Sequence, residues 1–187
     1  MANYKRNVKL TEKDQRIIEF VKNCGICNTS TIHSIFYQGI SLRNCQLRLS
    51  KLTEGKHLKR FRENVNSQYY YYLGTRPKNY FHKSLFATTI AYMKTNGYDI
   101  TGYTTPFKIG DIIADGLIEI DNMYYFVEVE LSKKLDVEKY KKFYYSRAYK
   151  ELCSYMPTII LISNKKCPVL PSYIKVTHYK LADIERG

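Results

Sequence analysis

The stretch DIIADGLIEIDNMYYFVEVELSKK, residues 111–134, contains two apolar segments separated by the dipeptide Asp121-Asn122. This dipeptide is typical of a tight turn between strands, so the stretch predicts a β-hairpin. Glu128 and Glu130 lie two residues apart in its second strand. They therefore share one face, because strand side chains alternate between the two faces. Two glutamates on one face of an otherwise apolar hairpin predict a polar site.

Asp115 supplies a third carboxylate near these two glutamates. It lies at the start of the first strand, and we expect it to face the same point as Glu128 and Glu130. Three converging carboxylates would form an oxygen-rich site, which suits a hard cation such as Mg²⁺. The metal ligands would then be Asp115 and Glu128. The competing interpretation is a half-exposed edge strand whose glutamates are solvated.

The order Asp, turn, Glu-x-Glu resembles the motif of the PD-(D/E)xK nuclease superfamily. Glu130 stands where that superfamily usually has Lys, and Ala114 stands where it usually has Pro. The helix predicted over residues 79–96 contains no Glu, whereas many active members carry one in that helix. Lys133 or Lys134 could supply the missing positive charge. The resemblance implies an α/β domain whose mixed sheet is flanked by helices.

The net charge of +13 is unevenly distributed along the 187 residues. Residues 1–100 carry 17 Lys and Arg against 6 Asp and Glu, whereas residues 101–187 carry 13 against 11. A basic half joined to a near-neutral half indicates a module that binds a polyanion. Nucleic acid is the first candidate. An anionic membrane surface fits less well, because the basic residues are interleaved with a helical pattern.

Other features of the sequence favour a cytoplasmic protein without a membrane segment. No apolar run approaches the roughly 20 residues that span a bilayer, and the first residues lack the apolar core of a signal peptide. The five cysteines have no dense spacing, which favours reduced thiols over a disulfide framework.

The basic half has the element order of a small DNA-binding domain. Apolar spacing and capping residues predict three helices and then two strands, over residues 11–25, 29–37, 41–54, 57–62 and 68–73. Three short helices followed by a hairpin resemble a winged helix-turn-helix, and the resemblance covers about residues 10–75. We therefore expect a winged helix-turn-helix DNA-binding domain over 1–75 and a nuclease-like domain over 76–187.

The third predicted helix would read the DNA. Its outward Arg, Asn and Gln side chains are the types that contact base edges in the major groove, and basic residues on the wing would meet phosphates. The predicted DNA-binding residues are Ser41, Arg43, Asn44, Gln46, Arg48, Lys51, Lys56, Lys59, Arg60 and Arg62. The other interpretation is a basic, solvated face on a protein-binding winged helix, but the charge asymmetry favours DNA.

The second half supports the nuclease-like interpretation by its element order. The predicted elements are a helix (79–96), a strand (98–103), a hairpin of two strands (108–131), a second helix (136–155) and two further strands (158–163 and 173–179). This is the core order of the superfamily named above. The predicted fold class is therefore α+β, with a winged helix-turn-helix followed by an α/β PD-(D/E)xK nuclease-like domain.

A winged helix followed by a nuclease-like domain with Glu-x-acid is similar to the replication-relaxation family of plasmids and conjugative elements. The resemblance is carried by residues 10–73, the helix with His82, and the ADG, LIEI and FVEVELSKK segments before a Lys-rich helix. It implies an accessory role at a transfer origin or in plasmid replication, with a relaxase or replication initiator as partner.

Three functional hypotheses follow. In the first, the protein is a sequence-specific, double-stranded DNA-binding accessory protein that needs no cofactor, and its second domain docks a partner or forms a homodimer. In the second, it is a Mg²⁺-dependent endonuclease or nickase, with Asp115 and Glu128 on the metal and Glu130 or Lys133 acting on the water. In the third, it is a transcriptional regulator with a sensor domain. We favour the first, in which the protein is not an enzyme.

Overall fold

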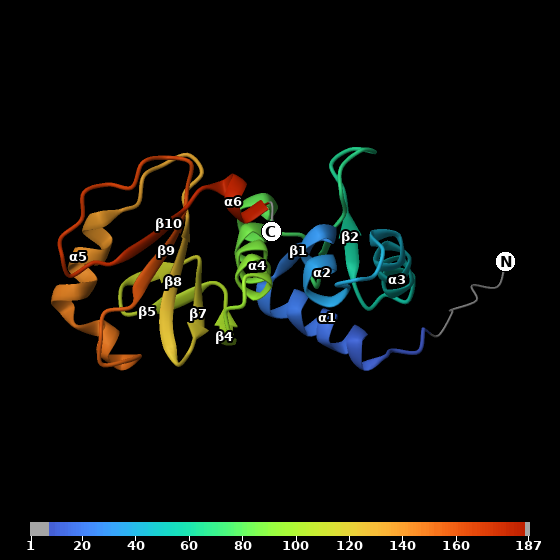
Figure 1. The fold of residues 1–187 in the computed structure, drawn as a ribbon, viewed down its shortest axis with the longest axis horizontal. Coiled ribbons are helices and arrows are strands. Elements are labelled where there is room, and N and C mark those ends of the chain that lie inside the picture. Colours follow the sequence, from blue (N-terminus) through green and yellow to red (C-terminus); the bar gives the residue numbers. More distant parts are fainter. Residues whose placement is uncertain (1–7, 186–187) are drawn as a thin grey trace. The chain divides into compact units, whose positions relative to one another are not determined.

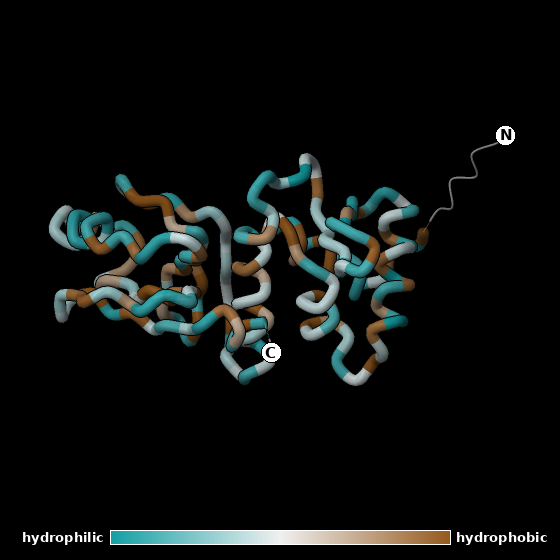
Figure 2. Tube along the Cα trace, turned by 90° about the horizontal axis from the view of Figure 1, so that it is seen from above, coloured by the Kyte–Doolittle hydropathy of each residue, from teal (hydrophilic) through white to brown (hydrophobic). Residues whose placement is uncertain are grey.

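The computed structural model describes residues 8–185 and has a mixed α+β fold, in which a mixed sheet is flanked by helices (Figure 1). The chain divides into two compact units, Met1–Ala91 and Tyr92–Gly187, here called the first and second units. In Figure 2, polar and apolar residues intersperse along both units. Between residues 8 and 185, no helix is long and apolar enough to cross a membrane.

The first unit contains three helices and a small sheet. Its elements are α1 (Glu12–Cys24), β1 (Ile26–Asn28), α2 (Thr29–Phe36), α3 (Leu42–Glu54), β2 (Lys59–Phe61) and β3 (Tyr70–Tyr72). The sheet has the order β1-β3-β2, and both pairings are antiparallel. The three predicted helices and two predicted strands are confirmed, although the strands are shorter than expected. Strand β1 was not predicted, because three residues are too few to show an alternating pattern.

The helices of the first unit begin where the sequence places good N-caps. Thr11 and Asp14 form a capping box, in which the Asp14 amide donates to Thr11 Oγ1 at 3.2 Å and the Thr11 amide donates to Asp14 Oδ2 at 2.7 Å. The Thr31 amide donates to Asn28 Oδ1 at 2.8 Å, and the Asn44 amide donates to Ser41 Oγ at 3.4 Å. The caps fix the starts of α1, α2 and α3.

Helix α4 (Tyr80–Thr95) contains the division between the units. The remaining elements are β4 (Ile100–Thr104), β5 (Phe107–Ile109), β6 (Ile112–Ala114), β7 (Gly116–Ile120), β8 (Met123–Val129), α5 (Val137–Ser146), the 3-10 turn Ala148–Glu151, β9 (Thr158–Ile162), β10 (Val176–Tyr179) and α6 (Leu181–Glu185). The main sheet has the order β10-β9-β8-β7-β4. Strands β8, β9 and β10 are parallel, whereas β7 is antiparallel to both β4 and β8.

Strand β8 lies inside this sheet, between β7 and β9. The interpretation of residues 123–131 as a half-exposed edge strand with solvated glutamates is therefore wrong. The strand ends at Val129, and Glu128 is only 5% exposed. Figure 1 shows β8 and β9 side by side, with α5 next to them.

The helix predicted over 136–155 is shorter than expected. It ends at Ser146, because Arg147 adopts the left-handed conformation with φ of 59°. A residue in that conformation ends a helix, since its carbonyl no longer points along the helix axis. Tyr144, in the last turn of α5, stacks on Tyr173 with ring centroids 4.1 Å apart.

The core of the second unit joins α5 to the sheet. Phe126 of β8 is fully buried against Phe143 and Tyr140 of α5, with ring centroids 5.6 and 6.0 Å apart. Burying a large apolar side chain contributes about 1.5–3 kcal/mol. This packing fixes the position of α5 and brings its first turn to the carboxylates of the hairpin.

Candidate functional site

The predicted DNA-reading helix exposes one polar face. Cys45, Leu49 and Leu52 of α3 are fully buried, and their spacing of four and three residues places them on a single face. The predicted residues on the other sides of the helix are exposed: Ser41, Arg43, Asn44, Gln46 and Lys51. Of the six DNA-binding residues predicted in this helix and at its N-cap, all but Arg48 are thus exposed to solvent.

Leu47 is a member of this face that the sequence reasoning missed. Its side chain is 54% exposed, and it lies off the buried stripe of α3. A leucine displaced from the apolar stripe was the available signal. An exposed apolar side chain among polar ones can contact a thymine methyl group.

Four of the predicted DNA-binding residues follow this helix, one in the turn after α3 and three in the β2–β3 hairpin. Lys56, Lys59 and Arg62 are exposed, and Arg60 is half-buried. The guanidinium groups of Arg60 and Arg62 lie over the Tyr69 ring, 4.4 and 4.9 Å from its centroid. A cation held over an aromatic ring keeps its charge but loses mobility. The hairpin therefore presents two pre-ordered guanidinium groups.

Arg48 differs from the other predicted DNA-binding residues. Its Nε donates to Asp14 Oδ1 at 2.8 Å, and a second nitrogen donates to the Lys9 carbonyl at 3.0 Å. Its guanidinium also forms an ion pair with Asp14 Oδ2. Asp14 is 1% exposed. The structure thus commits Arg48 to joining α3 to the start of α1.

This ion pair predicts acid sensitivity of the first unit. Burial disfavours the Asp14 carboxylate, but hydrogen bonds from Arg48 and Thr11 outweigh that effect and lower its pKa from 3.8 to about 2. A lowered folded-state pKa contributes stability above the unfolded value, and that stability is lost as the pH falls through the folded value. We expect at most about 2 kcal/mol to be lost between about pH 4 and pH 2.

Urea unfolding of the wild type and of Asp14→Asn, followed at several pH values, measures this contribution. The wild type should lose more stability than the variant across that interval, because the amide cannot titrate. Equal pH dependence in the two proteins would contradict a stabilising ion pair.

The second region contains the carboxylates of the hairpin. Asp115 lies between β6 and β7, and its Oδ2 accepts a hydrogen bond from the Val129 amide at 2.9 Å. Its carbonyl accepts from Thr105 Oγ1 at 2.5 Å. The hydrogen bond from the Val129 amide joins the start of β7 to the end of β8. The structure therefore brings Asp115 next to the strand that carries Glu128.

Glu128 is buried and paired with α5. Its Oε1 accepts from Lys139 Nζ at 2.5 Å and from the Tyr140 hydroxyl. Lys139 Nζ also donates to the Ile113 carbonyl at 2.7 Å. Burial raises the pKa of Glu128, Lys139 and Tyr140 oppose that effect, and Asp115 adds to it. We name Glu128, Lys139 and Tyr140 the buried triad.

The buried triad also changes the pKa of Tyr140. Burial and the Glu128 carboxylate raise the pKa of its hydroxyl well above 10.0. Tyr140 therefore keeps its proton and acts as a donor to Glu128 at neutral pH. The carboxylate has two donors from one helix turn of α5, which hold its orientation.

Glu130 and Lys133 lie beyond the end of β8. The Glu130 amide donates to the Ile162 carbonyl at 2.9 Å, and its own carbonyl accepts from Ser163 Oγ at 2.8 Å. Lys133 and Lys134 are exposed in the segment before α5. The ammonium group beside Glu128 comes instead from Lys139 of α5, which lies in the Lys-rich helix that follows the hairpin in the sequence. The donor could not be chosen from sequence, because several lysines lie within reach.

The residues that the structure describes present no ready-made set of magnesium ligands. Within residues 8–185, no group of three or more His, Cys, Asp or Glu side chains is placed to hold a metal. Mg²⁺ requires near-octahedral oxygen ligands, whereas the Glu128 oxygen Oε1 already accepts from an ammonium group and a hydroxyl.

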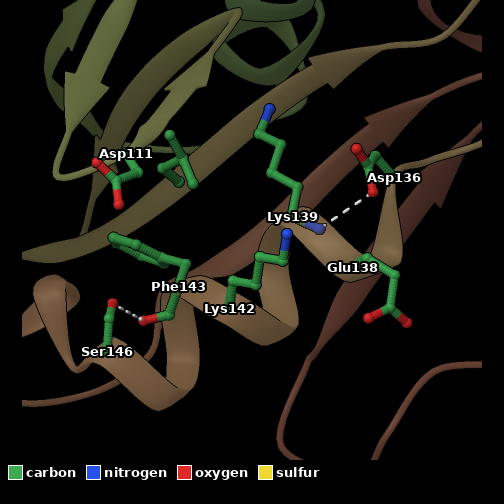
Figure 3. A pocket seen from close by; sticks show the side chains of 8 residues that line it. Asp111, Asp136, Glu138, Lys139, Lys142, Phe143 and Ser146 are labelled. Carbon is green, nitrogen blue, oxygen red and sulfur yellow. Dashed lines mark hydrogen bonds between the residues drawn. The ribbon is translucent and has the colours of Figure 1, made fainter.

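A cavity of about 500 Å³ lies beside α5 (Figure 3). Its lining includes Lys139 and Lys142, but also the carboxylates of Asp111, Asp136 and Glu138. Asp136 is the N-cap of α5 and accepts from the Lys139 amide at 3.0 Å. Because both signs of charge line the cavity, its electrostatics do not select an anion such as phosphate.

A cavity of about 430 Å³ lies in the first unit and is lined by α3 and the β2–β3 hairpin. Gln46, Arg60 and Arg62 contribute to it, together with residues of the hairpin turn and of β3. No acidic residue is among those that line it. In contrast to the cavity beside α5, it has a single sign of charge.

Comparisons with known proteins identify no family for the chain. No family model and no curated protein matches it. Among solved structures, the crystal structure of protein VC1899 from Vibrio cholerae is similar, with 13% sequence identity and a TM-score of 0.34. The match covers 91% of the present chain but only 42% of the Vibrio cholerae protein.

Proposed function

We propose that the first unit is a winged helix-turn-helix domain that binds double-stranded DNA. The observation that carries this proposal is the exposed polar face of α3, with Arg43, Asn44, Gln46 and Lys51 opposite its buried stripe. The basic β2–β3 hairpin follows as the wing. The excess positive charge of residues 1–100 supports the same partner, because a phosphate backbone attracts it regardless of sequence.

The second unit acts, in this proposal, as a nuclease-like domain that does not cleave DNA and instead associates with a partner or with a second copy. The buried triad supports this role, since Lys139 and Tyr140 occupy Glu128. The assignment to a cytoplasmic accessory protein of a plasmid or conjugative element, with a relaxase or replication initiator as partner, is supported by the sequence resemblance described above.

Duplex binding should depend steeply on salt. If about five basic side chains neutralise phosphates, the logarithm of affinity should fall with the logarithm of salt concentration at a slope of about −4 to −5. Affinity should then drop about 10²- to 10³-fold between about 50 and 200 mM salt. Fluorescence anisotropy with a labelled duplex measures the slope. A slope near zero would mean that phosphates are not the partner.

Supercoiled plasmid tests the second unit in the same conditions. With Mg²⁺ or Mn²⁺ present we expect a gel shift without nicking, and Asp115→Ala should leave DNA affinity unchanged. EDTA should not alter the shift. Metal-dependent nicking that disappears in Asp115→Ala would overturn the non-catalytic role and make the protein an endonuclease.

A further inference from the structure

We propose that the cavity lined by α3 and the β2–β3 hairpin binds one unpaired nucleotide, with its phosphate on Arg60 and Arg62 and its base beside Gln46 and Gln68. The inference deepens the proposed function, because it gives this region a ligand that a base-paired duplex does not offer. The unpaired nucleotide can come from DNA or from a free nucleoside monophosphate, and the experiment separates these sources.

The two arginines supply the phosphate-binding part of the cavity. Arg60 and Arg62 both lie over the Tyr69 ring, and Arg62 is further held by a hydrogen bond from a guanidinium nitrogen to the Val65 carbonyl at 2.9 Å. Arginine is suited to phosphate because its planar donors match two oxygens at once. Because no carboxylate is among the lining residues, no anion of the lining competes with a phosphate for these two cations.

The size of the cavity and the uncharged polar residues in its lining favour a whole nucleotide over phosphate alone. A cavity of about 430 Å³ falls in the range of small-molecule sites, about 300–1,000 Å³. Gln46 carries a side-chain amide donor and acceptor, the combination that pairs with the hydrogen-bonding edge of a base. Gln68 Oε1 already accepts from the amide and the hydroxyl of Ser30, at 3.2 and 3.1 Å, so Gln68 would contribute its amide NH₂ as a donor. A base inside a cavity cannot be paired in a duplex, so its nucleotide must be unpaired or extruded.

Tyr71 gives a second, independent indication of a ligand. It is fully buried and among the lining residues, and its hydroxyl has no hydrogen-bond partner within residues 8–185. Burial raises the pKa of this hydroxyl, and nearby Thr29 and Arg60 partly offset the effect without completing a hydrogen bond. A buried hydroxyl without a partner costs stability, and a ligand in the cavity would supply that partner.

The test compares a blunt duplex with the same duplex carrying one unpaired adenosine, using the full chain. We expect the bulged duplex to bind about tenfold more tightly. Adenosine 5′-monophosphate should remove this preference by competition, whereas adenosine or inorganic phosphate at equal concentration should not. Direct titration of the monophosphate by calorimetry then shows whether the free nucleotide binds by itself, which identifies the source.

Two variants link the effect to the cavity. Gln46→Ala should abolish the preference for the bulge, and Tyr71→Phe should reduce monophosphate affinity about fivefold while leaving thermal stability unchanged or higher. Tyr72→Phe is the matched control, because Tyr72 neighbours Tyr71 in β3 but does not line the cavity. If the Tyr71→Phe protein unfolds, the hydroxyl must have a partner within the protein, and this indication of a ligand is wrong. Gln46→Ala would then be the variant that tests the site.

The outcomes separate the two proposals. Equal affinity for blunt and bulged duplexes, with no monophosphate binding, would overturn the nucleotide site and leave duplex binding standing. Monophosphate binding without affinity for any duplex would overturn the proposed function and leave the site standing. Inorganic phosphate that competes as well as the monophosphate would reduce the site to a simple anion site and overturn the role of the base.

Discussion

Replacing Lys139 with Met should destabilise the second unit by about 3 kcal/mol. The substitution keeps most of the hydrocarbon stem but removes the ammonium group that pairs with Glu128, whose side chain is 6% exposed. Removing one partner of a buried ion pair leaves the other charge without compensation, which typically costs about 3–5 kcal/mol. We take the lower end, because the Lys139 side chain is 23% exposed and water can partly replace it.

The pH dependence of this loss has a definite sign. The pKa of Glu128 is already raised from 4.5 by burial, and removal of Lys139 raises it further. A raised folded-state pKa gives stability that is present below the unfolded value and lost as the pH rises through the folded value. The penalty of Lys139→Met should therefore be largest at neutral pH and shrink as the pH falls towards 4.5.

Hydrogen exchange of β7, β8 and β9 amides measures this effect in the second unit, and amides of α1 and α3 serve as an internal control. The matched variant is Lys139→Met combined with Glu128→Gln, in which no buried charge remains and Tyr140 can still donate to the amide oxygen. Most of the lost stability should return in the double variant. If the double variant is as unstable as the single one, Lys139 acts through packing and not through its charge.

The local features that the sequence predicted are those with local causes. Thr11 and Ser41 cap their helices through residues three positions away, so a short window contains the whole interaction. The same holds for the buried stripe of α3, whose spacing follows from helix geometry. Exposure of the predicted DNA-binding face follows from that stripe.

The features that the sequence did not reveal depend on partners far apart in the chain. Arg48 has the residue type and helix position of a base reader, but it pairs with Asp14, 34 residues away. Lys139 reaches Glu128 only because Tyr140 and Phe143 of α5 pack on Phe126 of β8. Likewise, the unpartnered hydroxyl of Tyr71 is a property of the assembled unit. No periodicity in a single segment contains such information.

Reversing two charges on α3 should nearly abolish duplex binding. Arg43→Glu with Lys51→Glu replaces two exposed cations of the proposed reading face by anions, so attraction to phosphate becomes repulsion. We expect affinity to fall about 100- to 1,000-fold and the salt slope to shrink by about 2. Because both side chains are exposed, folding stability should change by only about 0.5 kcal/mol each.

Arg48 is deliberately left intact in this variant, since its loss would expose the first unit to the uncompensated charge of Asp14. The control is Arg16→Glu with Lys22→Glu on α1, which changes the net charge by the same amount at exposed positions. Lys22 lies in the last turn of α1, as Lys51 lies in the last turn of α3. If the α1 variant loses as much affinity as the α3 variant, binding follows the overall charge of the first unit. A much larger loss of affinity in the α3 variant means that the DNA lies against α3. Two variants with the same change in net charge can differ in affinity only if the altered residues differ in their distance from the DNA.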